Sequence, residues 1–173
     1  MNILICSSSR EEGNKEYFYL AESVAKEISN LGYHLVFGAA SSGIMGRCRN
    51  NFDIVYSYTI EKYREDLENI KSTEEYLLDT TFDRTKEMYQ KADIILALPG
   101  GTGTIAEIFS ILEENRSISN PKPFIIYNYN GYYDNLLKII DTAIENNFND
   151  FSIKNYFTVC DSLDKIIEIV KEH

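Results

Sequence analysis

Three glycines and a carboxylate follow an apolar run in the middle of the chain, and these residue types suit a phosphorylated ligand. Residues 93–98 (DIILAL) lead into residues 99–104 (PGGTGT), and Glu107 follows three positions later. Glycines let the backbone turn sharply and leave its N–H groups accessible to a ligand. We predict that a helix opens at Thr104, and a helix N-terminus carries roughly half a positive charge that attracts anions. Glu107 is then expected in the first helical turn, where a carboxylate can reach the sugar of a bound nucleotide.

A structural interpretation of the same residues is also open. Thr104 and Glu107 have the spacing of a capping box, in which the glutamate only accepts a hydrogen bond from a backbone N–H at the start of its own helix. Glycine-rich turns between strands and helices also occur without any ligand. The rest of the chain has to decide between the two interpretations.

The composition indicates one globular domain with an acidic surface. The chain has 173 residues, of which 44% are hydrophobic and 25% charged, and its net charge is −10. This length predicts a single domain over residues 1–173 with a real core. The acidic surface excludes nucleic acid as a partner, because binding to a phosphate backbone depends on lysine and arginine. A small anionic ligand then needs a local positive feature, such as a helix N-terminus.

No segment predicts export or membrane insertion. No apolar run approaches the roughly 18 to 20 residues of a membrane span, and residues 1–6 are too short for a signal peptide. We therefore expect a cytoplasmic protein with no membrane partner. Cys6, Cys48 and Cys160 are odd in number and widely spaced, which argues against disulfides and a metal cluster. We expect three buried or idle thiols and no metal site.

Strands alternate with helices along the whole chain. Short apolar runs predict the strands, and apolar residues at helical spacing predict the helices between them. The expected strands cover residues 2–6, 34–37, 53–58, 74–78, 93–98, 124–127 and 156–159. The expected helices cover residues 15–31, 60–71 (a charged helix or helical loop), the segment around and after Arg84, the segment from Thr104, 132–147 and 162–171. This order predicts an α/β fold, with a doubly wound, Rossmann-like, mainly parallel sheet flanked by helices on both faces.

Three loops are expected to converge on one crevice. Loops 7–13, 38–46 and 99–104 all follow strands, and doubly wound sheets bind ligands outside the carboxyl ends of their strands. The first loop carries serine hydroxyls that either contact a ligand or belong to an ordinary polar loop. Arg84 lies near a helix start, where the helix dipole disfavours a cation. That conflict indicates a functional role for Arg84, and a solvated arginine is the alternative.

The sequence resembles the LOG family, the cytokinin riboside 5′-monophosphate phosphoribohydrolases that were formerly described as lysine decarboxylases. Residues 99–107 match the family pattern PGGxGTxxE in full. Residues 79–88 (DTTFDRTKEM) are similar to the family segment DTMHxRKxEM, and the spacing from Arg84 to Glu107 agrees with the family's arginine and glutamate. Residues 122–123 and 130–134 are similar to its KP and DGYY segments. The likeness covers nearly the whole chain.

The chain departs from the family pattern around the expected pocket. Residues 38–46 are GAASSGIMG where the family usually has GGGxxGLMG, and residues 6–9 are CSSS where it has CGSS. The residues that differ are Ser7, Ala39, Ala40, Phe82 in place of histidine, Thr85 in place of lysine, and Glu113 in place of threonine. We expect these changes at the base and entrance of the pocket, where they affect the choice of substrate more than the phosphate site.

The resemblance implies hydrolysis of the N-glycosidic bond of a purine nucleoside 5′-monophosphate, such as AMP or an N6-modified relative, to free base and ribose 5-phosphate. It implies Glu107 as the carboxylate that stabilises the oxocarbenium-like sugar and orients water, and Arg84 as the partner of the anionic substrate or the departing base. It also implies a homodimer that needs no cofactor and no metal. The expected substrate- and phosphate-binding residues are Ser8, Ser9, Gly43, Met45, Gly100, Gly101, Thr102, Gly103 and Thr104.

Two other functions are open from the sequence. A non-catalytic carrier of a nucleotide or cofactor on the same scaffold keeps the phosphate loop without needing Glu107 and Arg84 together. An amino-acid decarboxylase needs a lysine that holds pyridoxal phosphate in a suitable loop, and nothing in the sequence indicates such a lysine.

Overall fold

Seven parallel strands form one sheet in the computed structural model, which describes residues 1–173. Their order across the sheet is β4-β3-β2-β1-β5-β6-β7, and all six pairings are parallel. The strands are β1 (Asn2–Cys6), β2 (His34–Phe37), β3 (Val55–Ile60), β4 (Glu74–Leu78), β5 (Ile94–Ala97), β6 (Phe124–Tyr127) and β7 (Thr158–Cys160). The predicted α/β class with a parallel, doubly wound sheet is confirmed.

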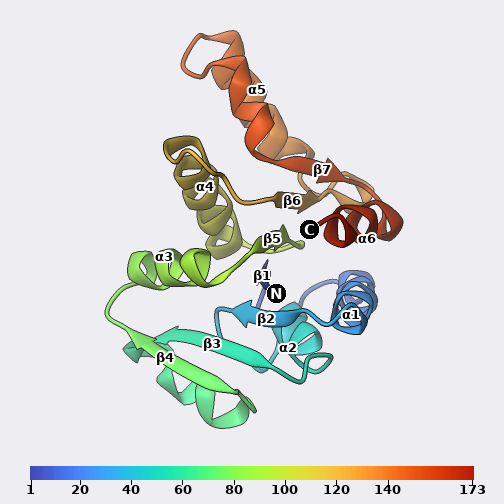
Figure 1. Cartoon of the computed structure of the whole chain (residues 1–173), viewed down its shortest axis with the longest axis vertical. Helices are drawn as coiled ribbons and strands as arrows, with labels where there is room; N and C mark the ends of the chain where they lie inside the picture. Colours follow the sequence, from blue (N-terminus) through green and yellow to red (C-terminus); the bar gives the residue numbers. More distant parts are fainter.

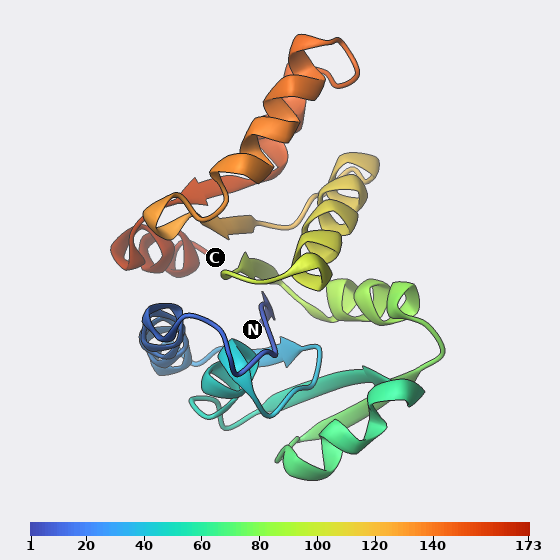
Figure 2. The same ribbon diagram turned by 180° about the vertical axis from the view of Figure 1, so that it is seen from behind.

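Helices cover both faces of this sheet. Figure 1 shows α1, α2 and α6 on one side and α3, α4 and α5 on the other, and Figure 2 shows the same layers from behind. The α-helices are α1 (Lys15–Asn30), α2 (Gly43–Arg49), α3 (Thr81–Lys91), α4 (Thr102–Ser117), α5 (Asp134–Glu145) and α6 (Leu163–Lys171). Three 3₁₀ segments complete the chain, η1 (Glu61–Asn69), η2 (Tyr129–Gly131) and η3 (Phe151–Tyr156). No helix has both the length and the apolar character that crossing a membrane requires.

Each face of the sheet is buried in its own apolar cluster. Ile3 and Ile5 of β1 pack in the cluster formed with α1, α2 and α6, whereas Leu4 and Cys6 pack in the cluster formed with α3, α4 and α5. This division follows from the geometry of a strand, in which successive side chains point to opposite faces. The last side chain of β1, Cys6, therefore points toward α3 and α4.

Some element boundaries differ from the sequence prediction. α4 begins at Thr102 rather than Thr104, and β3 covers residues 55–60 rather than 53–58. The last strand covers residues 158–160 rather than 156–159, because η3 occupies the residues before it. The side chain of Asp150 caps η3 by accepting a hydrogen bond from the Ser152 N–H, a local signal that an apolar strand pattern does not reveal.

Backbone contacts dock the loop after β1 onto the start of α2. The Met45 N–H donates to the Ser8 carbonyl oxygen at 3.0 Å, and the Ser42 hydroxyl donates to the Ser9 carbonyl oxygen at 2.7 Å. Gly43 has a φ of +62°, and a Cβ built there would lie 2.6 Å from the Ser9 carbonyl carbon. Both the left-handed conformation and this close approach require glycine at this position.

We predict that Gly43→Ala destabilises the protein by more than the backbone conformation alone explains. Gly32 is the matched control, since it has a φ of +82° and a Cβ there would meet nothing within 4 Å. Gly32→Ala is expected to lower the free energy of unfolding by about 1 kcal/mol, the cost of a left-handed alanine. Gly43→Ala should cost at least about 2 kcal/mol, because the loop must also move. Equal losses in urea unfolding would contradict the tight contact between the two loops.

Candidate functional site

A cleft of about 490 Å³ opens at the carboxyl ends of β1, β2 and β5. Its wall is formed by residues 7–10 after β1, residues 38–40 after β2 and residues 101–104 after β5, so the three predicted loops do converge. The remaining lining residues are Met45, Tyr63, Asp66, Arg84 and Glu107. The cleft lies where β1 and β5 adjoin, the point at which the strand order reverses and doubly wound sheets bind their ligands.

Two tyrosines hold the loop that precedes α4. The Tyr133 hydroxyl donates to the Leu98 carbonyl oxygen at 2.6 Å, and the Tyr132 hydroxyl donates to the Gly100 carbonyl oxygen at 2.8 Å. Gly101 is the N-cap residue of α4, and no side chain caps the helix. The first amide groups of α4 therefore have no partner within the helix, and they leave its positive end available to an anion.

Glu107 lies in the second turn of α4, because the helix begins at Thr102. The prediction of a first-turn position was wrong by one turn. The capping-box interpretation is also wrong, since Thr104 lies inside the helix and Gly101 is the N-cap residue. Instead, Glu107 belongs to the buried face of α4 with Ile108 and is only 5% exposed.

Arg84 reaches this carboxylate from the neighbouring helix α3. Its Nη2 donates to Glu107 Oε1 at 3.0 Å, and the two side chains are 14% and 6% exposed. Arg84 precedes the buried Met88 by one turn, so the two share a face of α3 that packs toward the sheet. The guanidinium lies over the end of β2, where a Cβ built on Gly38 would lie 3.6 Å from Arg84 Cζ. The unfavourable position of the Arg84 cation near the start of α3 is thus compensated by the Glu107 carboxylate of α4.

The charge state of Glu107 is set by opposing effects. Burial raises its pKa above the ordinary value of a glutamate, whereas the Arg84 guanidinium and a hydrogen bond from the Cys6 thiol lower it. The net direction is upward. Burial, and to a lesser extent the neighbouring Glu107 carboxylate, raise the pKa of Cys6 well above its usual range, so this residue stays a neutral thiol. The cleft therefore holds a carboxylate that accepts a proton more readily than an exposed one.

Most of the predicted binding residues line the cleft. Those on its wall are Ser8, Ser9, Met45, Gly101, Thr102, Gly103 and Thr104. Gly43 and Gly100 lie behind the wall instead, where they permit close packing: a Cβ on Gly100 would overlap the Thr104 side chain. The sequence prediction missed Tyr63 and Asp66, which η1 brings to the wall. Their segment is charged and has no buried residue, so its pattern resembles that of a solvated helix.

The departures from the family pattern do not all lie at the cleft. Ala39 and Ala40 line it, and Ala39 has a φ of +52°, a conformation that costs an alanine roughly 1 kcal/mol. Phe82 is 81% exposed on α3, and neither Thr85 nor Glu113 lines the cleft. The expectation that all these changes surround the pocket was therefore correct only for the loop residues.

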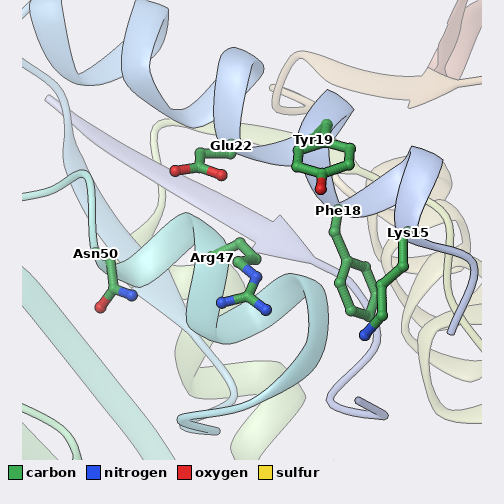
Figure 3. Close-up of a pocket in the computed structure, with 6 residues that line it drawn as sticks. All are labelled: Lys15, Phe18, Tyr19, Glu22, Arg47 and Asn50. Atoms are coloured by element: carbon green, nitrogen blue, oxygen red, sulfur yellow. The ribbon is translucent and has the colours of Figure 1, made fainter. Parts of the chain in front are cut away.

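A second hollow of about 260 Å³ lies between α1 and α2, away from the cleft. Figure 3 shows its lining residues, which are Lys15, Phe18, Tyr19, Glu22, Arg47 and Asn50. Lys15 Nζ lies 4.5 Å from the centroid of the Phe18 ring, and Glu11 pairs with both Lys15 and Arg47. The positive charges of Lys15 and Arg47 in this hollow are thus already compensated by the Glu11 carboxylate. Nowhere do three or more histidine, cysteine or acidic side chains form a group that could hold a metal ion.

Comparison with known proteins identifies the family. A family profile described as "Possible lysine decarboxylase" matches residues 37–170. The chain belongs to this family. The predicted resemblance to the LOG proteins is confirmed by a probable cytokinin riboside 5'-monophosphate phosphoribohydrolase of Oryza sativa subsp. japonica, which is 32% identical over 183 residues, 98% of this chain and 84% of the relative. A cytokinin riboside 5'-monophosphate phosphoribohydrolase of Rhodococcoides fascians is 28% identical over 174 residues, 97% of this chain and 87% of the relative.

Solved structures share the fold of this LOG-family chain at much lower sequence identity. The molybdenum cofactor carrier protein of Chlamydomonas reinhardtii superposes with a TM-score of 0.71 at 14% identity, covering 99% of this chain and 96% of the carrier. DNA processing protein A of Helicobacter pylori superposes with a TM-score of 0.66 at 12% identity, covering 99% and 80% of the two chains. At such identities the likeness shows the fold alone.

We predict that Arg84→Met destabilises the protein in a pH-dependent manner. Removing one partner of a buried ion pair typically costs roughly 3–5 kcal/mol, which we expect in urea unfolding at pH 7. Because Arg84 lowers the pKa of Glu107, its loss raises that pKa further. A carboxyl group whose pKa is raised by folding destabilises the fold when it must ionise and does not when it is protonated in both states. The loss should therefore shrink as the pH falls toward about 4.3, the ordinary pKa of a glutamate.

The double variant Arg84→Met/Glu107→Gln serves as the control for this prediction. It removes the unpaired charge, so most of the stability lost at pH 7 should return and the pH dependence of the loss should disappear. A loss that is the same at every pH, or one that the second substitution leaves unchanged, would show that Arg84 does not compensate the charge of Glu107.

Proposed function

We propose that this protein hydrolyses the N-glycosidic bond of a purine nucleoside 5′-monophosphate and releases free base and ribose 5-phosphate. The observation that carries the proposal is the position of the Arg84–Glu107 pair in the same cleft as the open N-terminus of α4. One site then offers a positive end for a phosphate and a fixed carboxylate for the sugar. Membership of the LOG family and the names of the relatives support this activity.

The phosphate is proposed to bind at residues 101–104. The amide groups of Thr102, Gly103 and Thr104 and the threonine hydroxyls are donors that suit phosphate oxygens. Glu107 follows the N-cap Gly101 by six residues, which is about 9 Å along a helix axis at 1.5 Å per residue. That separation leaves room for a pentose between a phosphate at the N-terminus and the carboxylate.

Glu107 is proposed as the catalytic carboxylate. Cleavage of the glycosidic bond builds positive charge on the sugar, which a nearby carboxylate stabilises. A water oxygen forms the new bond to C1′ and its proton passes to Glu107. The electron pair of the C1′–N bond leaves with the base, which takes up a proton from solvent, and Glu107 returns its proton to solvent after the reaction. The raised pKa of Glu107 suits a group that accepts a proton near neutral pH. Arg84 holds the carboxylate in place and offers its charge to the departing base.

Tyr63 and Asp66 are proposed to contact the base. A tyrosine ring face can stack on a purine. A carboxylate accepts a hydrogen bond from an exocyclic amino group, so adenine is the base that this wall suits. AMP and its N6-isopentenyl derivative are accordingly the first two substrates to compare.

The resemblance also supports further proposals about the whole protein. We propose that residues 1–173 form one domain, because a single sheet contains all seven strands. We propose a homodimer, as the family resemblance implies, and a cytoplasmic location, as the sequence analysis predicts.

The two alternative functions have less support. A non-catalytic carrier would bind a nucleotide through residues 101–104 without turnover, and the fold alone connects this chain to carrier proteins. A decarboxylase acting through pyridoxal phosphate uses a lysine as its Schiff base, and none of the residues that line the cleft is a lysine.

We predict that Glu107→Gln lowers the rate of adenine release from AMP by at least about 100-fold, as expected when an electrostatic stabiliser of the transition state is lost. Glu113→Gln is the matched control, since Glu113 lies on the same helix but is exposed outside the cleft. Free adenine is measured by chromatography, and circular dichroism checks that both variants are folded. Binding of AMP without release of adenine by the unaltered protein would favour the carrier function instead.

The 5′-phosphate is predicted to be essential. Two hydrogen bonds to a charged group, each worth about 1.5 kcal/mol, correspond to roughly a 100-fold preference, so kcat/KM for adenosine should be at least that much lower than for AMP. Ribose 5-phosphate should inhibit competitively, whereas free ribose should not. Equal rates with adenosine and AMP would contradict a phosphate site at the start of α4.

A further inference from the structure

Helix α3 carries Arg84, but only its far end is anchored in the core. Of its 11 residues, Met88 and Tyr89 alone lie in the apolar core, and both are near the C-terminal end of the helix. Tyr89 follows Arg84 by five residues, which is about 7.5 Å along a helix axis at 1.5 Å per residue. The place of Arg84 over the cleft therefore depends on what holds the C-terminal end of α3.

Tyr89 is joined to α4 through the buried side chain of Asn115. The Tyr89 hydroxyl donates to Asn115 Oδ1 at 2.7 Å, and Asn115 is completely buried. Asn115 Oδ1 also accepts from the Lys122 N–H at 3.0 Å, and Asn115 Nδ2 donates to the carbonyl oxygens of Lys122 at 2.9 Å and Tyr156 at 3.3 Å. A side-chain amide can make four hydrogen bonds, and Asn115 makes all four. A buried polar group that is fully paired in this way favours one unique packing arrangement.

Lys122 holds the same end of α3 through a second set of contacts. Its Nζ donates to the carbonyl oxygens of Tyr89 at 2.6 Å, Gln90 at 3.1 Å and Ala92 at 2.5 Å. These carbonyl groups belong to the last turn of α3 and its C-cap residue, where they lack partners within the helix and attract a cation. The C-terminal end of α3 is therefore fixed both to α4 and to the segment that leads into β6.

Two polar contacts thus join α3 to α4. The Arg84–Glu107 pair lies at the cleft, whereas the Tyr89–Asn115 hydrogen bond lies away from it, since Asn115 follows Glu107 by eight residues, or about 12 Å of helix. Apolar packing is non-directional, whereas a hydrogen bond has a preferred distance and angle. The Tyr89–Asn115 bond therefore fixes how far α3 can slide along α4, which apolar packing alone does not.

We infer that Tyr89 is a positioning residue for the proposed reaction: through its hydrogen bond to Asn115 it sets the place of α3 on α4 and holds Arg84 where it pairs with Glu107. This inference rests on the proposed function and adds to it a contact outside the cleft, because neither Tyr89 nor Asn115 lines the cleft. A misplacement of about 1 Å, even from a change far from the chemistry, can cost about 100-fold in rate. The proposed phosphate site belongs to α4, so it does not depend on the place of α3.

The test removes the tyrosine hydroxyl alone. Tyr89→Phe should lower kcat for adenine release from AMP by at least about 10-fold, while KM changes by less than about 2-fold because the start of α4 stays in place. Tyr33→Phe is the matched control, since the Tyr33 hydroxyl donates to the Val170 carbonyl oxygen at 2.8 Å in the apolar cluster on the other face of the sheet. Both variants lose one buried hydrogen bond, so a purely structural effect would be the same in both.

A double variant tests whether the effect passes through Arg84. In the Arg84→Met background, Tyr89→Phe should lower kcat further by less than about 2-fold, because the group that Tyr89 positions is absent. Two results would overturn the inference while the proposed function stands. One is the same kcat for Tyr89→Phe and Tyr33→Phe, and the other is a loss of kcat on Tyr89→Phe that is as large in the Arg84→Met background as in the unaltered protein.

Urea unfolding gives a readout without turnover. The Arg84→Met and Glu107→Gln single and double variants measure the coupling between the two side chains, first in the unaltered protein and then with Tyr89→Phe. Tyr89→Phe should weaken this coupling by at least about 5-fold as a ratio of unfolding equilibrium constants, and Tyr33→Phe should leave it unchanged. If AMP releases no adenine, the proposed reaction fails and this measurement decides the inference alone: a weakened coupling supports it, and an unchanged coupling overturns it.

Discussion

The buried ion pair between Arg84 and Glu107 is the constraint on which the rest of the site depends. Two charges taken out of water are tolerated only when they face each other with good geometry, and here the distance is 3.0 Å. The pair therefore fixes α3 relative to α4 above the carboxyl ends of the strands. It also keeps a carboxylate in a place where burial alone would favour its protonated form.

Around this pair, the loops after β1 and β5 are held by contacts within the protein, whereas the first amide groups of α4 are free to bind a ligand. Gly43 lets the loop after β1 press against α2, and Tyr132 and Tyr133 hold the loop after β5. The amide groups at the start of α4 have no partner within the helix. The cleft at the reversal of the strand order is therefore held by fixed loops and includes the start of α4 in its wall. A protein of net charge −10 needs such a local group of hydrogen-bond donors to bind an anionic ligand.

Solved structures that share the fold are named as a molybdenum cofactor carrier and a DNA processing protein, whereas a sequence relative is named as a phosphoribohydrolase, so the fold does not decide the function. The side chains at the cleft carry that information. A carrier has no need to keep a carboxylate and a guanidinium buried together, whereas glycosidic cleavage needs a fixed negative charge beside the sugar. Ala39, which stands where the family pattern has glycine, is one cleft residue in which this chain differs, and it keeps the left-handed backbone conformation that favours glycine.

The sequence by itself determined the parallel α/β class and the three loops that meet, and it singled out Glu107 and Arg84 as candidate site residues, because strand and helix periodicity and a nine-residue pattern are local properties. It did not determine the partner of Glu107, since the spacing of Thr104 and Glu107 also fits a capping box, and only the packing of α3 against α4 shows that the carboxylate pairs with Arg84. Tyr63 and Asp66, the packing role of Gly43 and Gly100, and the hydrogen bond between Tyr89 and Asn115 depend on contacts between distant segments. Such contacts depend on how the helices pack against the sheet, which a local sequence pattern does not predict.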